Sequence, residues 1–349
     1  MPPNCLLSKD QISKWRNEGA VVIQLPESIW KNAYKEVHHA YPQQRPENWK
    51  DDFGSPDGKF AFPTAKLING KVSNYKALDD LVLNEELIKI AQVLLNTDDI
   101  LLTQADAWCK YGSGHKNGDS LGNKDQRIHM DYGNHTFLCP NTWDDPEVLS
   151  AILYYDDSDV CSGGTAIVPK NGPNDELYKM PYINMPGQAN MPFANQKSVA
   201  EEIVKERDPK MWEFRQKLYE REEKVNFKPG SLLLYRHDVW HRGTEVNLGT
   251  SRRVHNFVWK RADCPWVHTW NQAFTYWNYY GIVEDIIIRS SPLQRSVIGF
   301  PKPEDPVWRD KRRIRNVEAR YPGIDMSMYG PRRKSRSQRA SANFHTESN

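Results

Sequence analysis

From residue 100 onward the sequence alternates short apolar or β-branched runs with turn-forming residues, and this pattern restricts the folds that the chain can adopt. Clusters of Gly, Pro, Asn and Asp separate runs that each have the length of one β-strand. The expected strands are 100–108, 149–155, 165–168, 231–235 and 252–260. Several short strands between turns, preceded by helices, are typical of a jelly-roll double sheet. We therefore expect an α+β chain with a mostly β core, a double-stranded β-helix of the cupin type, with helices flanking it at both ends.

The N-terminal part has the apolar spacing of helices. Ser8 and Gln11 form a capping box ahead of the first helix, and Gly19 is its expected end. Beyond it we expect a strand at 20–23, helices at 26–40 and 78–95, and a loop at 42–74, which is rich in Pro, Gly, Asn and Lys.

These patterns predict a single domain over residues 1–325 with its jelly-roll core at about 98–262. A charged helical stretch at 196–224 is expected to be an insertion between strands, because strand texture resumes after it. The segment 263–325 is expected to be helical and rich in aromatic residues, with a lid over the substrate as the alternative. The segment 326–349 is expected to be a disordered basic tail, because the run Arg-Arg-Lys-Ser-Arg-Ser-Gln-Arg from Arg332 lacks acidic and large apolar residues.

Composition indicates the compartment in which the chain is expected and the kinds of partner that it binds. Its 349 residues carry 47 Lys and Arg against 45 Asp and Glu, so a net charge of +2 gives no global attraction to nucleic acid or membrane; the basic tail is the one exception. Five cysteines, without Cys-x-x-Cys, favour a reducing compartment. No apolar run approaches the roughly 20 residues that span a bilayer. Since we find neither a signal peptide nor a C-terminal peroxisomal tripeptide, we expect a cytoplasmic protein.

Two candidate metal ligands, His129 and Asp131, lie two residues apart after a polar loop. Side chains on a strand alternate between faces, so both point the same way. With a second imidazole they would form the two-His-one-carboxylate set of non-haem Fe(II) oxygenases. On its own the pair is weak evidence, because roughly one His-x-Asp/Glu arises by chance in such a chain, and a surface hydrogen bond explains it equally well.

The third ligand has three candidates, His237, His241 and His255. His241 is preferred, because it follows a strand and precedes a glycine that lets a ligand approach the backbone closely. His237 is expected to be a neighbouring or surface histidine. His255 falls on the opposite face from Arg252 if their strand alternates.

An arginine follows His241 on the next expected strand. Arg252 supplies a planar fork suited to the distal carboxylate of 2-oxoglutarate, which needs a partner if it is buried. It is preferred to Arg253 because it shares a face with Val254, which is expected to look inward. A solvated strand charge is the alternative for either arginine.

The chain resembles the phytanoyl-CoA dioxygenase-like (PhyH) family of oxygenases over most of residues 8–262. The residues that carry the resemblance are Gln11-x-x-x-Trp15-x-x-x-Gly19-Ala20-Val21-Val22-Ile23, His129-x-Asp131, Ser162-Gly163-Gly164-Thr165-Ala166-Ile167-Val168-Pro169, Lys228-Pro229-Gly230-Ser231-Leu232-Leu233-Leu234-Tyr235, His241-Arg242-Gly243 and Arg252. It implies a jelly roll in which His129, Asp131 and His241 hold Fe(II) and act as the catalytic residues, with Arg252 anchoring 2-oxoglutarate.

The co-substrate site has four further candidates. Family members often place a hydroxyl two residues after the distal histidine; here that position is Gly243, so Thr244 or Ser251 is expected to substitute. Gln104 and Lys110, on and after the strand at 100–108, are candidate co-substrate contacts, although ordinary strand polarity explains each of them as well.

The resemblance implies Fe(II), with 2-oxoglutarate and O2 as co-substrates, and hydroxylation of an unactivated C–H bond in a small-molecule or lipid-like substrate, giving succinate and CO2. Related halogenases replace the carboxylate ligand with a small residue, so Asp131 favours hydroxylation. Two alternatives stay open: an oxygenase acting on a protein or nucleic acid, and a jelly-roll binding protein without catalysis. The sequence predicts no oligomeric state.

Overall fold

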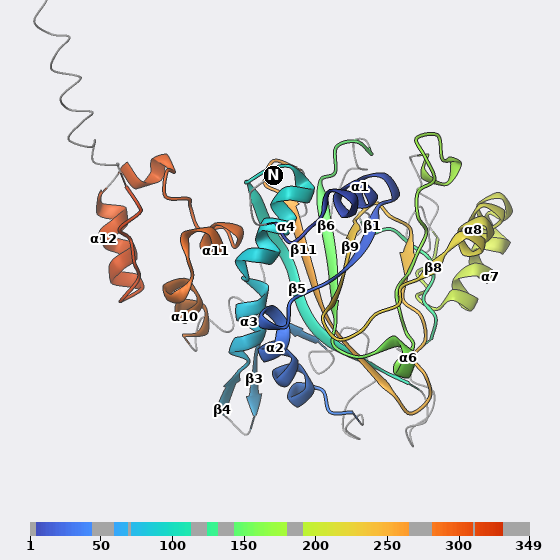
Figure 1. Cartoon of the computed structure of the whole chain (residues 1–349), viewed down its shortest axis with the longest axis horizontal. Coiled ribbons are helices and arrows are strands. Elements are labelled where there is room, and N and C mark those ends of the chain that lie inside the picture. The colour runs from blue at the N-terminus through green and yellow to red at the C-terminus, as the bar shows by residue number, and fades with distance from the viewer. Residues whose placement is uncertain are drawn as a thin grey trace, which may run out of the picture.

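The computed structural model describes residues 5–43, 59–68, 71–112, 124–131, 143–179, 191–264, 281–309 and 311–330. Within them the centre of the molecule is an antiparallel six-stranded sheet, opposed by a smaller three-stranded one (Figure 1). The large sheet has the order β1 (Ala20–Gln24), β9 (Ser231–Arg236), β6 (Val148–Tyr154), β11 (Ser251–Arg261), β5 (Ile100–Tyr111) and β2 (Lys59–Ala61). The small sheet has the order β10 (His241–Arg242), β7 (Ala166–Ile167) and β8 (Glu223–Lys224). The expected fold class, a jelly-roll β core with flanking helices, is confirmed.

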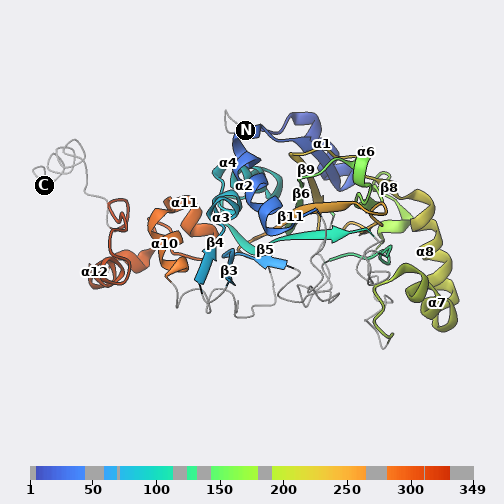
Figure 2. The same ribbon diagram turned by 90° about the horizontal axis from the view of Figure 1, so that it is seen from below.

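Helices cover one face of the large sheet and both ends of the molecule. Figure 2 shows α1, α2 and α4 on one side of the sheet that contains β5 and β11, while α7 and α8 lie at the opposite end from α10, α11 and α12. The helices are α1 (Lys9–Glu18), α2 (Glu27–Ala40), α3 (Lys76–Val82), α4 (Glu85–Leu95), α6 (Ser158–Cys161), α7 (Lys197–Arg207), α8 (Pro209–Arg221), α10 (Ile282–Arg289), α11 (Pro292–Val297) and α12 (Lys311–Arg320), with short 3-10 turns at Glu176–Tyr178 and Pro306–Arg309. No helix in the described ranges is both long and apolar enough to cross a membrane.

Period-two alternation divides each central strand between two cores. On β6, Leu149, Ala151 and Leu153 pack with the helices in the main core, whereas Tyr154 belongs to a second core that also contains Ile167 of the small sheet. Successive strand side chains point to opposite faces, so the even-numbered positions of β6 and β11, and those of β5 from 104 to 110, look into the space between the sheets. This inner face is where the candidate site lies. A register shift at Val258/Trp259 turns Ile100 and Leu102 to the helix-covered core instead.

The N-terminal helix forms as its sequence predicts. The Ser8 hydroxyl accepts from the Gln11 backbone N–H at 3.1 Å, and the Gln11 side chain accepts in return from the Ser8 backbone. Ile12 and Trp15 are buried, and Gly19 ends the helix in the left-handed region at φ 93°. That conformation favours glycine.

Two expectations about the N-terminal half are wrong in part. The stretch 42–74, expected to be loop, contains β2, β3 (Ala65–Ile68) and β4 (Lys71–Asn74) within its described residues. The expected helix at 78–95 is two helices, because the Asn84 side chain accepts from the N–H groups of Glu86 and Leu87 and starts α4 as a separate helix. Both features were missed because strands of three or four residues, and a capping residue within a continuous apolar pattern, leave little periodicity in the sequence.

The remaining expectations concern the insertion, the C-terminal segment and the tail. The insertion at 196–224 contains α7 and α8, with Pro209 at the first turn of α8. Residues 282–320 contain α10, α11, a 3-10 turn and α12, joined by short non-helical links where described. The aromatic residues at 265–280 and the tail from 331 lie outside the described residues, and the division at residue 325 stays a prediction.

Replacing Gly19 should test how tightly α1 docks on the sheet. A Cβ at this position would overlap Val239 and the Trp143 ring, on top of the left-handed backbone. We expect Gly19→Ala to lower the free energy of unfolding by about 2–4 kcal/mol in urea denaturation, the sum of backbone and overpacking costs.

Gly249→Ala is the matched control. Gly249 also has a positive φ, 71°, but no atom lies within 4 Å of the added Cβ. Its cost should be limited to about 1 kcal/mol of backbone strain. Equal losses for both variants would mean that the contact with Val239 and Trp143 contributes nothing.

Candidate metal centre

His129, Asp131 and His241 converge at one point on the inner side of the jelly roll. Their potential ligand atoms all lie within 4.8 Å of one another. Asp131 Oδ1 lies 3.5 Å from His129 Nε2, and Asp131 Oδ2 lies 3.3 Å from His241 Nε2. The sequence predicted this set, and the structure brings all three residues together.

Backbone pairing produces this convergence. The His129 N–H donates to the His241 carbonyl at 2.9 Å, and the His241 N–H donates back at 2.8 Å. The sequence suggested a regular strand at residues 127–131. The structure instead has an extended segment there, which is joined to β10 through an isolated bridge. In an antiparallel pair, directly opposed residues place their side chains on the same face.

Hydrogen bonds fix the orientation of both imidazoles. His129 Nδ1 lies 3.0 Å from the Arg127 carbonyl, and His241 Nδ1 lies 2.9 Å from the Val239 carbonyl. A carbonyl only accepts, so each Nδ1 carries the proton and each Nε2 lone pair faces Asp131. This is the tautomer that a metal ligand needs, with the backbone carbonyl as the outer partner.

The centre favours an ionised Asp131. Burial acts to raise its pKa, but His241 and His129 outweigh that effect and hold the pKa well below the usual value. The Tyr235 hydroxyl also donates to Asp131 Oδ2 at 3.2 Å. Burial lowers the pKa of His129, whereas Asp131 outweighs burial at His241 and raises the pKa of that imidazole. A carboxylate with two imidazoles therefore forms a charged, chelating set.

The two other histidine candidates occupy different places. The backbone carbonyl of His237 accepts from the Asp131 N–H at 3.1 Å, and His237 Nδ1 pairs with Ser150 Oγ at 2.8 Å, so this histidine borders the centre. His255 is on the helix-covered face, stacked on Phe257 with ring centroids 4.5 Å apart. Burial lowers the pKa of His255 to about 4.

Arg252 and Arg253 point to opposite faces of β11. Arg253 pairs with Asp156 at 2.8 Å and donates to the Tyr41 carbonyl on the helix-covered side. Arg252 is 3% exposed and lies over the Trp108 ring on the inner side, 5.0 Å from its centroid. It donates to the Gly163 carbonyl, and its Nε has no partner. No carboxylate pairs with it among the described residues, and burial lowers its pKa.

Lys110 and Thr244 border Arg252, but Gln104 does not. Lys110 pairs with Arg252 across the β5–β11 ladder, and its amine donates to the Thr244 carbonyl at 2.7 Å. Burial, followed by Arg252, lowers the pKa of Lys110 to about 7. The Thr244 hydroxyl donates to the Gly164 carbonyl at 2.7 Å. Gln104 lies six residues along β5 from Lys110, on the order of 20 Å away, and its amide donates to Asp106.

The α7–α8 insertion holds the metal-centre segment from behind. The Ile128 N–H donates to the Tyr219 hydroxyl at 3.0 Å, and the Ile128 carbonyl accepts from Arg215 at 3.1 Å. Arg215 is fully buried and pairs with Glu201 at 2.6 Å. Ile128 and Met130 pack beside Leu218 in a separate hydrophobic cluster. The insertion therefore fixes one face of residues 127–131 and turns the other face toward the centre.

Sequence reasoning assigned no role to Arg127 or Tyr235. Arg127 has the same parity as His129 and Asp131, and its charge acts on the centre: it lowers the pKa of both imidazoles and interacts favourably with Asp131. Tyr235 has the same parity as the inward-facing Leu233. Strand parity, applied to every polar residue rather than to metal ligands alone, would have found both.

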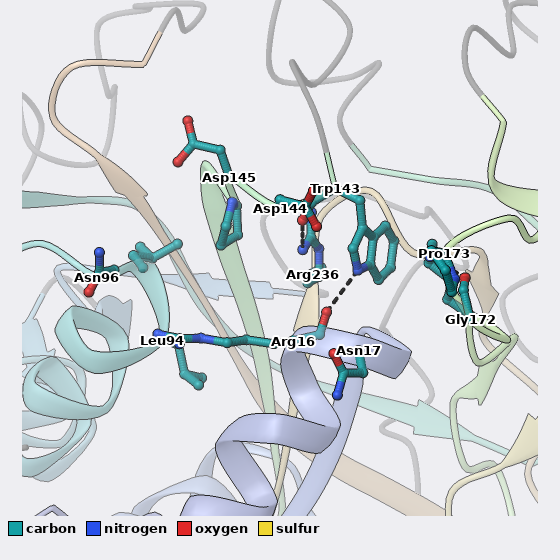
Figure 3. A pocket seen from close by; sticks show the side chains of 13 residues that line it. Arg16, Asn17, Leu94, Asn96, Trp143, Asp144, Asp145, Gly172, Pro173 and Arg236 are labelled. Atoms are coloured by element: carbon teal, nitrogen blue, oxygen red, sulfur yellow. Dashed lines mark hydrogen bonds between the residues drawn. The ribbon is translucent and has the colours of Figure 1, made fainter.

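A separate pocket of about 650 Å³ lies between the ends of α1 and α4 and the segment 143–146 (Figure 3). The Trp143 indole N–H donates to the Arg16 carbonyl at 2.7 Å. The Arg236 guanidinium carbon lies 3.9 Å from the centroid of the Trp143 ring, and the Lys170 amine lies 5.1 Å from it. Its lining contains none of the metal-centre residues. These contacts fasten α1 to β9 on the helix-covered side.

No protein-family model and no curated protein sequence matches this chain. Solved structures of similar fold include EvdO2 from Micromonospora carbonacea var. aurantiaca, with 13% identity and a TM-score of 0.49, covering 78% of this chain and 98% of that chain. The non-heme alpha ketoglutarate dependent carbocyclase SnoK from nogalamycin biosynthesis has 16% identity and a TM-score of 0.44, covering 75% and 88%. EctD from S. alaskensis has 11% identity and a TM-score of 0.45, covering 74% and 79%. Similarity this low carries no argument about the reaction, and membership of the phytanoyl-CoA dioxygenase-like family stays a prediction.

Removing the partner of Arg215 should loosen the metal-centre segment. Glu201→Gln leaves a buried guanidinium without its carboxylate, so we expect a loss of about 3 kcal/mol in the free energy of unfolding and weaker binding of Fe(II) or Co(II) in anaerobic titration. Glu202→Gln, on the exposed side of the same helix, should stay within about 0.5 kcal/mol of the parent. If both variants bind metal like the parent, the insertion does not position residues 127–131.

Proposed function

We propose that this chain is an Fe(II)- and 2-oxoglutarate-dependent oxygenase of the phytanoyl-CoA dioxygenase-like type that hydroxylates a C–H bond of a small-molecule substrate. The observation that carries the proposal is the convergence of His129, Asp131 and His241 on one side of a jelly roll whose inner face also holds the buried, carboxylate-free Arg252. Neither feature alone points to this chemistry, and the two together support it.

The donor set fits a divalent iron. Two imidazole nitrogens and one carboxylate oxygen occupy a single face and leave the remaining positions open, the arrangement typical of Fe(II) sites that bind a chelating co-substrate and O2. When bound, the iron would supply oxidative decarboxylation of 2-oxoglutarate to succinate and CO2, coupled to attack on the substrate. Asp131 keeps the carboxylate ligand, which favours hydroxylation.

Arg252 is suited to hold the distal carboxylate of 2-oxoglutarate. Its guanidinium is buried, donates to a single carbonyl and keeps Nε free, so a carboxylate there would satisfy a charge that the described protein leaves unpaired. Lys110 adds a second amine beside it, and Thr244 lies on the same side. We infer that all three residues contact the co-substrate or its immediate support.

Two tyrosines bridge the space between the arginine and the metal centre. Tyr154 interacts with Arg252, and Tyr235 interacts with both Tyr154 and Asp131. Both tyrosines are buried. Their rings exclude water from the path between the two ends, and a dry path strengthens each electrostatic contact made by the co-substrate. Gln104, which lies far along β5, is better placed to face substrate than to contact the distal carboxylate.

The ligand variants test the metal centre. Asp131→Ala and His241→Ala should each abolish substrate-linked consumption of 2-oxoglutarate and the absorption band that forms when Fe(II) and 2-oxoglutarate are mixed with the protein without O2. His39→Ala, an exposed histidine on α2, should behave like the parent. Parental turnover by Asp131→Ala would end the proposal.

The arginine variant tests the co-substrate anchor. Arg252→Ala should keep Fe(II) binding but raise the 2-oxoglutarate concentration needed for half-saturation by roughly 10- to 100-fold, the loss of one or two hydrogen bonds to a charged group. Arg207→Ala, on the exposed end of α7, should not change it. An unchanged requirement in Arg252→Ala would move the co-substrate site elsewhere.

A further inference from the structure

The extended segment 127–131 has two faces with opposite character. Ile128 and Met130 are buried in the hydrophobic cluster beside the α7–α8 insertion. Arg127, His129 and Asp131 alternate with them and therefore project to the other side. The metal ligands mark that side as the candidate site, so Arg127 belongs to it as well.

Arg127 is buried and forms no ion pair with a carboxylate of the described residues. It is 7% exposed, its Nη1 donates to Asn195 Oδ1 at 3.3 Å, and its guanidinium lies 4.8 Å from the centroid of the Phe193 ring. Nε has no partner, and Nη2 has no hydrogen bond with any described residue. Nε and Nη2 form the side edge of the guanidinium, whose two parallel N–H groups match the two oxygens of a carboxylate.

The other buried arginines of the described residues, apart from Arg252, each have a carboxylate or several backbone carbonyls as partners. The carboxylates of Glu201, Asp238, Glu222 and Asp156 pair with Arg215, Arg236, Arg242 and Arg253 respectively. Arg295 lacks a carboxylate but donates to three backbone carbonyls and to the Tyr329 hydroxyl. Within the described ranges, Arg127 therefore shares its condition, buried with one acceptor and no carboxylate, with Arg252.

Charge balance points to an anionic group at Arg127. A divalent metal, the Asp131 carboxylate, the two carboxylates of 2-oxoglutarate and Arg252 together carry no net charge, and Lys110 beside Arg252 can only add positive charge. Arg127 then remains as a positive charge beside the ligands, where an isolated buried ion is costly. Burial of a matching anion removes that cost.

We propose that Arg127 is the substrate anchor and that the substrate carries a carboxylate, held side-on by Arg127 Nε and Nη2 next to the metal centre. The inference rests on the proposed function, since it places the anchor on the same open side as the iron. The site would thus have two carboxylate anchors, Arg252 for the co-substrate and Arg127 for the substrate. The exposed Phe193 ring beside Arg127 offers an apolar surface for the body of such an acid.

Matched pairs of small ligands test this assignment. The protein is loaded anaerobically with Fe(II) and 2-oxoglutarate, and the shift of the resulting absorption band and of the melting temperature is measured with benzoate and benzamide, phenylacetate and phenylacetamide, and phenyl phosphate. We expect the two carboxylates to shift both signals and their amides to leave them unchanged. In Arg127→Gln the carboxylate affinity should fall at least 10-fold, Arg127→Lys should recover part of it, and Arg207→Gln should match the parent.

The outcomes separate this inference from the proposed function. If the parent forms no Fe(II)–2-oxoglutarate band, the proposed function fails before the ligands are added. If the band forms but carboxylates bind Arg127→Gln as they bind the parent, or amides bind as well as acids, the anchor is overturned. Binding of phenyl phosphate alone would overturn the carboxylate assignment. Loss of 2-oxoglutarate binding in Arg127→Gln would assign Arg127 to the co-substrate and overturn the inference too.

Discussion

The candidate centre depends on one reciprocal pair of backbone hydrogen bonds, between His129 and His241. These bonds, at 2.9 and 2.8 Å, join an extended segment to β10 of the small sheet and place both imidazoles on the same face. Each imidazole then donates from Nδ1 to the backbone carbonyl two residues earlier in the chain. The backbone thus fixes the position, orientation and tautomer of both imidazoles, and no further side chain is needed to orient them for metal binding.

The distribution of buried charge supports the same reading of the site. A buried arginine ordinarily has a carboxylate, because desolvation of an unpaired ion costs more than folding can supply. Arg215, Arg242 and Arg253 follow that rule. Arg295 lacks a carboxylate but donates to three backbone carbonyls. Among the described residues, Arg252 and Arg127 have neither a carboxylate nor several carbonyls, and both lie on the inner side with the metal centre. A buried charged group without a partner in the protein is expected where a bound ligand supplies that partner.

Much of the fold was predictable from the sequence because its signals are periodic. The capping box at Ser8, the alternating strands β6, β9 and β11, and the helical insertion all follow from spacing. The short strands β2, β3 and β4 were missed, since three or four residues carry no periodicity. The break before α4 was missed because the apolar stripe continues across Asn84, whose side chain caps the start of α4.

The metal ligands were predictable because their residue types and spacing are uncommon. Residues whose role depends on their contacts were not predictable. A histidine and an aspartate two apart, with a distant His-x-Gly, specify the ligand set by type, and parity on β11 separates Arg252 from Arg253. The alternation of side chains also turns Tyr235 and Arg127 toward the site. The role of an arginine, however, can be inferred only when its partners are known. Asn195 and Phe193, the partners of Arg127, come from a loop that the sequence does not place.

The α7–α8 insertion explains why residues 127–131 stay extended without belonging to a sheet. Both backbone groups of Ile128 bond to insertion side chains, Tyr219 and Arg215, and the Arg127 N–H donates to the Asn195 carbonyl just before α7. A two-residue strand such as β10 offers too few ladder bonds to hold a metal centre alone. The insertion supplies the missing partners on the far side, so the polar side chains at 127, 129 and 131 are free to face the ligands.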